Sequence, residues 1–246
     1  MIEDILTVMW KEGKGLLRYN NNRWKSVAIL LTPLALFGII FPIQFRHQWL
    51  TSGWSVAVAV ITPLLLISST IAESFAGERE RHTLETLLAS RLPDRAILFG
   101  KLLMSITFGW GMTLFLLLVS LVVVNILEWT GVFQIYQTSI LWLDLAASLL
   151  MSGMVANLGL LISLRAPTVQ NAAQTIMLML FMPFLVLQAG VFLLPTFLPE
   201  ESIQAMLGYM NAATIVQILL SLLLAANIGL LLGAMARFKR SKLILI

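Results

Sequence analysis

Hydrophobic residues in this chain gather into six long runs, each apolar on every face. A helix needs about 20 apolar residues to cross a bilayer, and each run reaches that length. The alternating segments of a membrane β-barrel do not fit this pattern. The runs therefore predict an all-α membrane protein with six transmembrane helices, at residues of about 26–45, 53–76, 96–127, 139–164, 171–194 and 212–236.

Two shorter helical patterns flank these runs. Over residues 3–19, apolar residues including Trp10 share one face of a helix, and lysines lie elsewhere. This pattern favours an amphipathic helix in the membrane interface, in contact with lipid; an ordinary cytosolic leader helix is the alternative. Before the last run, residues 199–210 carry an apolar stripe but are too few to span a bilayer. They predict a short extracellular or re-entrant helix.

Composition favours one membrane domain. Hydrophobic residues make up 59% of the 246 residues and charged residues 11%, whereas a soluble domain is roughly 25% charged. We therefore expect a single transmembrane domain over residues 1–246. The chain contains no cysteine, which excludes disulfides and thiol chemistry. The first run begins too late and is too long for a cleavable signal peptide.

Basic residues are distributed unevenly between the connecting segments. If both termini are cytoplasmic, the inner segments carry 15 lysines and arginines and the outer segments only Arg46. Basic residues collect on the cytoplasmic side of membrane proteins. We therefore expect a multi-pass protein of the plasma or inner membrane with both termini inside. The same rule accounts for the net charge of +4 without nucleic acid as a partner.

The segment between the second and third runs is highly charged for so apolar a chain. Residues 73–101 hold five of the twelve acidic and five of the sixteen basic residues, and they keep helical spacing. Leu84, Leu87 and Leu88 share one face of this helix, and an exposed apolar face requires a cover. We therefore predict that residues 77–90 form a cytoplasmic helix that docks a soluble partner; a solvated surface helix is the alternative.

This charged segment contains a motif. Residues 76–90 read Ala-Gly-Glu-Arg-Glu-Arg-His-Thr-Leu-Glu-Thr-Leu-Leu-Ala-Ser, followed by Pro93 and by Gly100-Lys101. The run resembles the coupling-helix motif of ABC type-2 export permeases, and the resemblance covers the whole chain. The related haem-export permeases of cytochrome maturation stay an alternative. His82 stands where the family most often has glycine, which indicates that this position is tolerated as helix.

The resemblance implies a function and the residues that carry it. The chain would be the transmembrane permease subunit of an ATP-driven ABC exporter, bound to two copies of a separate ATPase subunit. It would pair with a second copy of itself or with a paralogous permease. ATPase coupling would fall to Gly77, Glu78, Arg79, Arg81, Leu84, Glu85, Leu87, Leu88, Arg165 and Gln170. The substrate path, lined by the second and fifth spans, would fall to Ser68, Ser69, Thr70, Gln174, Thr175, Met177 and Gln188.

Missing motifs narrow the function classes. The chain has no phosphate-binding G-x-x-x-x-G-K-[ST] loop, so we expect ATP and magnesium on the partner subunit and no cofactor here. His47 and His82 offer no pair for a metal, and no G-x-S-x-G nucleophile motif occurs. We therefore expect no enzymatic activity in this chain. The path that the resemblance implies would have an apolar lining with few charges, which would suit a hydrophobic or amphiphilic substrate such as a lipid, drug or peptide. The alternative is a non-transporting membrane subunit that acts on or senses an extracytoplasmic partner.

Overall fold

The computed structural model describes residues 1–18, 31–129, 131–197 and 211–238, and every regular element in that part of the chain is helical. The helices are α1 (Ile2–Arg18), the π-helix η1 (Leu34–Ile40), α3 (Phe41–Phe45), α4 (His47–Thr51), α5 (Trp54–Glu80), α6 (Leu84–Leu88), α7 (Asp94–Leu127), α8 (Thr138–Ser163), α9 (Val169–Phe197) and α11 (Ala212–Arg237). The predicted all-α fold is confirmed for these residues. The external helix predicted at residues 199–210 lies outside them.

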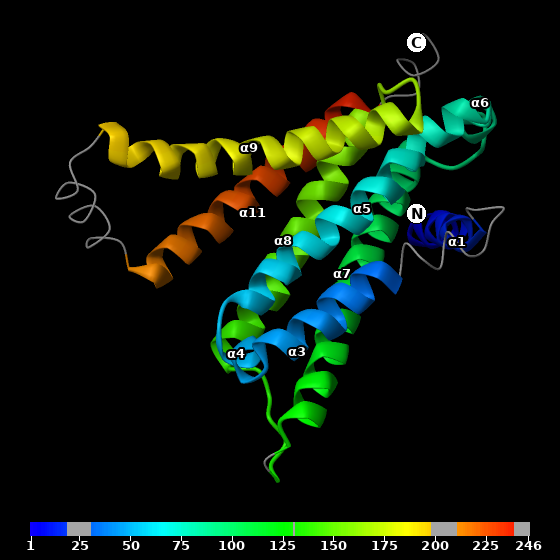
Figure 1. Cartoon of the computed structure of the whole chain (residues 1–246). Coiled ribbons are helices and arrows are strands. Elements are labelled where there is room, and N and C mark those ends of the chain that lie inside the picture. Colours follow the sequence, from blue (N-terminus) through cyan, green and yellow to red (C-terminus); the bar gives the residue numbers. More distant parts are fainter. Residues whose placement is uncertain (19–30, 130, 198–210, 239–246) are drawn as a thin grey trace.

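The three long helices α5, α7 and α8 form the centre of the molecule, with α5 packed along α8 (Figure 1). The main core lies between them and includes Ile71 and Phe75 of α5 and Leu160 of α8, all fully buried. A side chain at Gly159 of α8 would overlap Ile71, so glycine permits this close approach. Small residues commonly let membrane helices pack in this way.

Within the described residues, five helices are long and apolar enough to cross a membrane: α5, α7, α8, and the stretches Val169–Gly190 of α9 and Ala213–Arg237 of α11. They match five of the six predicted runs. The described part of the first run is a shorter apolar helix, Leu31–Phe45, which changes from η1 to α3. Pro42 accounts for the irregularity, because proline lacks an N–H and its ring clashes with the carbonyl one turn earlier. A sixth crossing stays a prediction.

The segments that carry the excess of basic residues share one end of the molecule. Figure 1 shows α1, α6 and the end of α11 grouped there, with α4 at the opposite end. Phe238, directly after α11, packs on Phe75 near the end of α5, with ring centroids 5.4 Å apart. This grouping is what the predicted topology requires, and we refer to this end as the basic end.

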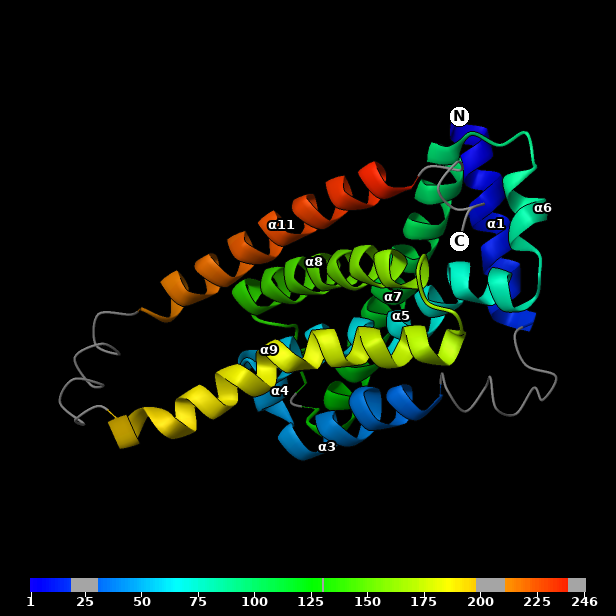
Figure 2. The ribbon, with the colours of Figure 1, turned by 90° about the horizontal axis from the view of Figure 1, so that it is seen from above.

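Helices α9 and α11 diverge from the central bundle (Figures 1 and 2). Buried Ala172 and Ile176 anchor the first turns of α9, but residues 181–186 are all exposed. Helix α11 contacts α8, where Asn227 donates a hydrogen bond to the backbone oxygen of Leu150 at 2.8 Å. The apolar outer halves of both helices are therefore open to lipid or to another membrane protein.

Candidate functional site

The predicted coupling helix is not one helix. Helix α5 continues the second span through Glu80, the chain turns, and α6 follows as a separate helix of five residues. His82 in the turn has a φ of +54°, a left-handed conformation that a right-handed helix does not contain. The expectation of a continuous helix over residues 77–90, with His82 tolerated inside it, is wrong. The segment forms a corner whose turn residue adopts the backbone conformation that glycine accepts most readily.

Four charged side chains tie this corner to the amino-terminal helix. Lys101 of α7 is 1% exposed; its Nζ donates to Oε1 of Glu12 at 2.8 Å and to the backbone oxygen of Ser74 at 2.6 Å. Lys11 donates to Oε1 of Glu78 at 2.6 Å, and Nζ of Lys101 lies 3.6 Å from the same oxygen. The cluster connects α1, α5 and α7, and it pairs the buried ammonium group with two carboxylates, as a charge removed from water requires.

The two residues that follow Glu78 join α5 to the connection between α8 and α9. Arg79 donates from Nη1 to the backbone oxygen of Ala166 at 2.6 Å and from Nη2 to that of Leu164 at 2.9 Å. Oε1 of Glu80 accepts a hydrogen bond from the backbone N–H of Val169, the first residue of α9, at 3.2 Å. A carboxylate at this position satisfies a free N–H group and interacts favourably with the helix dipole.

A buried hydroxyl strengthens the same junction one turn earlier. Oγ of Ser163, the last residue of α8, accepts hydrogen bonds from the backbone N–H groups of Phe75 and Ala76, at 3.0 Å each. It donates in turn to the backbone oxygen of Ala72 at 2.9 Å. The end of α5 is therefore fixed to the end of α8 and to the start of α9.

The apolar face of the corner is covered in part from inside the chain. Leu84 is 9% exposed and belongs to the main core, against which half-buried Leu87 packs. The side chain of Leu88 lies outside the described residues, and Gly77 is buried. The predicted coupling residues that remain exposed are Arg81, Glu85, Arg165 and Gln170. We call these four the polar face. Of the leucine stripe that we expected to meet a partner, Leu84 is enclosed in the core and Leu87 stays half-buried.

On α5, the hydroxyls predicted for the substrate path bond to the protein itself. Ser68 is buried; its Oγ donates to a backbone oxygen at 3.1 Å and lies 3.9 Å from Sδ of Met177 on α9. Ser69 and Thr70 donate to backbone oxygens three residues earlier, at 3.1 and 3.0 Å. These bonds satisfy the hydroxyl donors within the helix, as is common for serine and threonine in apolar helices.

On α9, the predicted path residues are more open. Gln174 and Gln188 are exposed, and half-buried Thr175 donates to the backbone oxygen of Asn171 at 2.8 Å. The structure therefore brings Ser68 and Met177 of the predicted path together inside the chain, whereas Ser69, Gln174 and Gln188 are exposed. Polar side chains in membrane helices usually face protein or a water-filled space rather than lipid.

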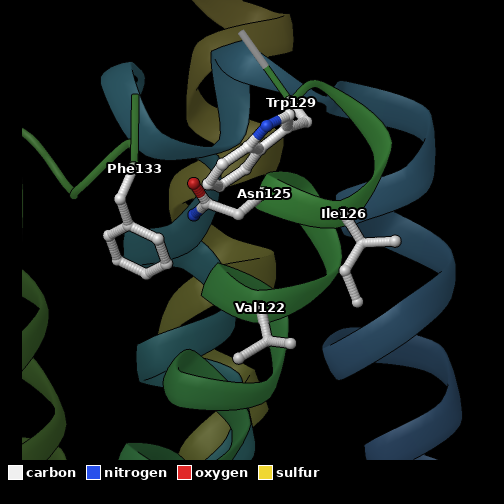
Figure 3. Close-up of a pocket in the computed structure, with 5 residues that line it drawn as sticks. All are labelled: Val122, Asn125, Ile126, Trp129 and Phe133. Carbon is white, nitrogen blue, oxygen red and sulfur yellow. The ribbon is translucent and has the colours of Figure 1, made fainter. Parts of the chain in front are cut away.

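A pocket of about 340 Å³ lies at the end of the molecule opposite the basic end, where α7 finishes (Figure 3). Its lining residues are Val122, Asn125, Ile126, Trp129 and Phe133. Asn125 is engaged in the fold, since it donates to the backbone oxygen of Gln134 at 2.9 Å and accepts from its N–H at 2.7 Å. The remaining surface is apolar, and Trp129 is 65% exposed. Tryptophan is typical of the membrane–water interface.

Only some residues of this charged cluster and its neighbouring bonds have a recognisable signal in the sequence. A lysine inside an apolar run is a recognisable signal, because an unpaired charge there is costly. Its partner Glu12 lies 89 residues earlier, and local spacing does not identify a partner at that distance. Ser163 carried no signal beyond its small size. Among the described residues, no group of three or more histidine, cysteine, aspartate or glutamate side chains could hold a metal ion.

Comparison with known proteins gives one result. A family model described as ABC-2 type transporter matches residues 3–211, which include the polar face and the first five predicted runs. No curated protein and no solved structure matches the chain.

Proposed function

We propose that this chain, which belongs to the ABC-2 type transporter family, is the membrane permease subunit of an ATP-driven exporter. A separate ATPase subunit binds at the basic end and contacts the polar face formed by Arg81, Glu85, Arg165 and Gln170. ATP and magnesium are held by that subunit, and hydrolysis there drives the movement of this chain. Both termini then lie in the cytoplasm, on the ATPase side of the membrane.

One observation carries this proposal. Arg81 and Glu85 belong to the corner after α5, whereas Arg165 and Gln170 belong to the connection between α8 and α9. The hydrogen bonds of Arg79 hold these two segments together. Exposed charged side chains thus come from both segments at one end of the molecule, while the neighbouring Leu84 and Ala166 are buried in the chain. A charged, polar surface of this kind suits a soluble protein partner whose charges complement it.

The outer surfaces of α9 and α11 support pairing with a second permease chain. Leu178 and Met182 of α9 and Leu222 of α11 are each more than half exposed, and Gln188 is exposed among such apolar neighbours. Lipid can cover exposed apolar side chains, but an amide side chain within the membrane needs hydrogen-bond partners, which protein or water provides. A second copy of this chain or a paralogous permease provides such a surface, and two ATPase subunits serve the pair.

The same proposal covers the direction of transport and the class of substrate. The substrate path forms between the two permease chains, where Gln174 and Gln188 of α9 meet the partner's surface. The surrounding side chains are largely apolar, which suits a hydrophobic or amphiphilic substrate such as a lipid, drug or peptide moving outward. Nucleic acid has no role in this proposal.

The test is co-purification of the permease with its ATPase. Isolated in mild detergent, the wild-type chain should retain an ABC ATPase, and the isolated permease should not hydrolyse ATP. Arg81→Glu combined with Arg165→Glu should release most of the ATPase, because like charges brought together at an interface cost several kcal/mol. Arg46→Glu, an exposed arginine at the opposite end, is the matched control and should retain it.

Thermal unfolding of the isolated permease separates loss of binding from loss of folding. The double variant should unfold at the wild-type temperature, because both side chains are exposed and surface substitutions usually change stability little. Full retention of the ATPase by the double variant would show that the polar face is not the contact surface. Tight ATP binding by the isolated chain would contradict the proposed division of labour.

A further inference from the structure

We infer that Arg79 and Glu80 form a clamp that makes the two segments of the polar face move as one body and passes their movement to α9. This inference rests on the proposed function, and it assigns a positioning role to two residues that do not themselves lie on the polar face. The role follows from the partners of their hydrogen bonds, which lie in the α8–α9 connection and at the first residue of α9.

Arg79 binds the α8–α9 connection at two points. Its two guanidinium nitrogens bind two backbone oxygens, of Leu164 and Ala166, on either side of exposed Arg165. The planar guanidinium group fixes both distance and orientation, which a single-point contact does not. A displacement of the corner after α5 is therefore shared by Arg165, and a displacement of Arg165 is shared by the corner.

Glu80 binds the first residue of α9. Its carboxylate accepts the N–H of Val169 at 3.2 Å. Val169 also lies beside Gly77, since a methyl group at residue 77 would make an ordinary contact of 3.5 Å with Cγ2 of Val169. Helix α9 is thus held at its starting point by the same two turns of α5 that present the corner to the partner.

The outer half of helix α9 can move when the start of the helix is displaced, because only the first turns are packed. Buried Ala172, Ile176 and Leu180 fix only its first three turns, and residues 181–186 are exposed. Segments with few buried contacts move most readily. A small rotation at Val169 becomes a larger displacement at the outer half of α9, because that half has no neighbour within the described part of the chain that buries it.

The experiment follows the movement of α9 in the assembled complex with its ATPase. The chain has no cysteine, so a single nitroxide can be attached at residue 186 in the outer half of α9, where Val186 is 65% exposed. In the wild-type complex, ATP with orthovanadate should change the spectrum of this label. Arg79→Ala and Glu80→Ala should retain the bound ATPase, and the nucleotide-dependent change should fall by about fivefold or more. Glu80→Gln keeps an acceptor oxygen and should restore most of it.

Matched controls come from the same end of the molecule. Arg95→Ala and Glu3→Ala remove exposed side chains of the same types that make no bond to the α8–α9 connection, and they should leave the spectral change at its wild-type size. If Arg79→Ala does not fold, Glu80→Ala decides, because Glu80 is exposed. A full spectral change in a Glu80→Ala complex that retains the ATPase would overturn the clamp alone. Failure of the wild-type chain to bind an ATPase would overturn the proposed function as well.

Discussion

The ammonium group of Lys101 lies 2.8 Å from Oε1 of Glu12, so a lysine of α7 fixes the amino-terminal helix to the membrane bundle. The lysine is 1% exposed, and the side chain of Glu12 is 23% exposed. The same ammonium group donates to Ser74 of α5 and lies near Glu78. Because Glu78 directly precedes the clamp residues, the position of α1 and the position of the corner depend on one buried charge.

We expect Lys101→Met to destabilise the permease by about 3 kcal/mol, at the lower end of the cost of breaking a buried ion pair. The cost is limited because Lys11 still neutralises Glu78 at 2.6 Å. The free energy of unfolding can be measured by chemical denaturation in detergent. Adding Glu12→Gln to Lys101→Met should recover part of the lost free energy of unfolding, because it removes the carboxylate that has lost its partner. Lys14→Met is the control: this lysine is exposed and lies over the ring of Trp10, a contact worth about 0.5–1 kcal/mol.

Gly100 provides a second test of how α1 is seated. A methyl group there would lie 2.5 Å from Cβ of Val8, which is itself 2% exposed. We expect Gly100→Ala to cost about 1–3 kcal/mol through overpacking and to expose α1 to added protease. Gly111→Ala on the same helix should be neutral or stabilising by about 0.5–1 kcal/mol, since nothing lies within 4 Å of the new methyl group. Equal protease resistance of wild type and Gly100→Ala would show that α1 is not held at this contact.

Local sequence pattern predicted the long helices well and the corner poorly. The predicted run at 96–127 corresponds to α7 (Asp94–Leu127), and the run at 139–164 to α8 (Thr138–Ser163). Apolar length alone determines such helices, because a bilayer imposes the same requirement on each. The charged segment was different. Helical spacing over residues 77–90 did not reveal the break at His82, where Thr83 turns back and donates from its backbone N–H to the backbone oxygen of Glu78 at 2.9 Å and from its hydroxyl to Oε2 of Glu78 at 2.7 Å.

The roles of the charged residues were also hidden from the sequence. Exposed and internally bonded charges have the same spacing along the chain, so the motif alone did not separate Arg81 from Arg79. The partners of Arg79 are backbone oxygens 85 and 87 residues away. Similarly, the leucine face of α6 was assigned to a partner because no cover was visible in the sequence. For Leu84, the cover is the chain's own core, and Leu87 is half-buried against it.

His82 is predicted to carry backbone strain that glycine would relieve. A left-handed conformation costs a residue with a side chain roughly 1–2 kcal/mol, whereas glycine loses about 0.5–1 kcal/mol through its freer unfolded chain. His82→Gly should therefore be neutral or stabilising by up to about 1 kcal/mol, and β-branched His82→Val should destabilise. Thermal unfolding of the isolated permease measures both. Thr86→Gly, within α6, is the control and should cost about 0.3 kcal/mol, the difference between the helix propensities of glycine and threonine. A marked loss of stability in His82→Gly would contradict the strained turn.

The last prediction concerns topology and uses the absence of cysteine from the chain. Single cysteines can replace exposed Thr86 at the basic end and Val132, which is 72% exposed and lies near the opposite end. Because 15 of 16 basic residues fall on one side of the predicted topology and such residues stay cytoplasmic, we expect opposite labelling. A membrane-impermeant thiol reagent should reach residue 132 in intact cells and residue 86 only after lysis. Labelling of residue 86 in intact cells would place the polar face outside, where no ATP-driven subunit could reach it.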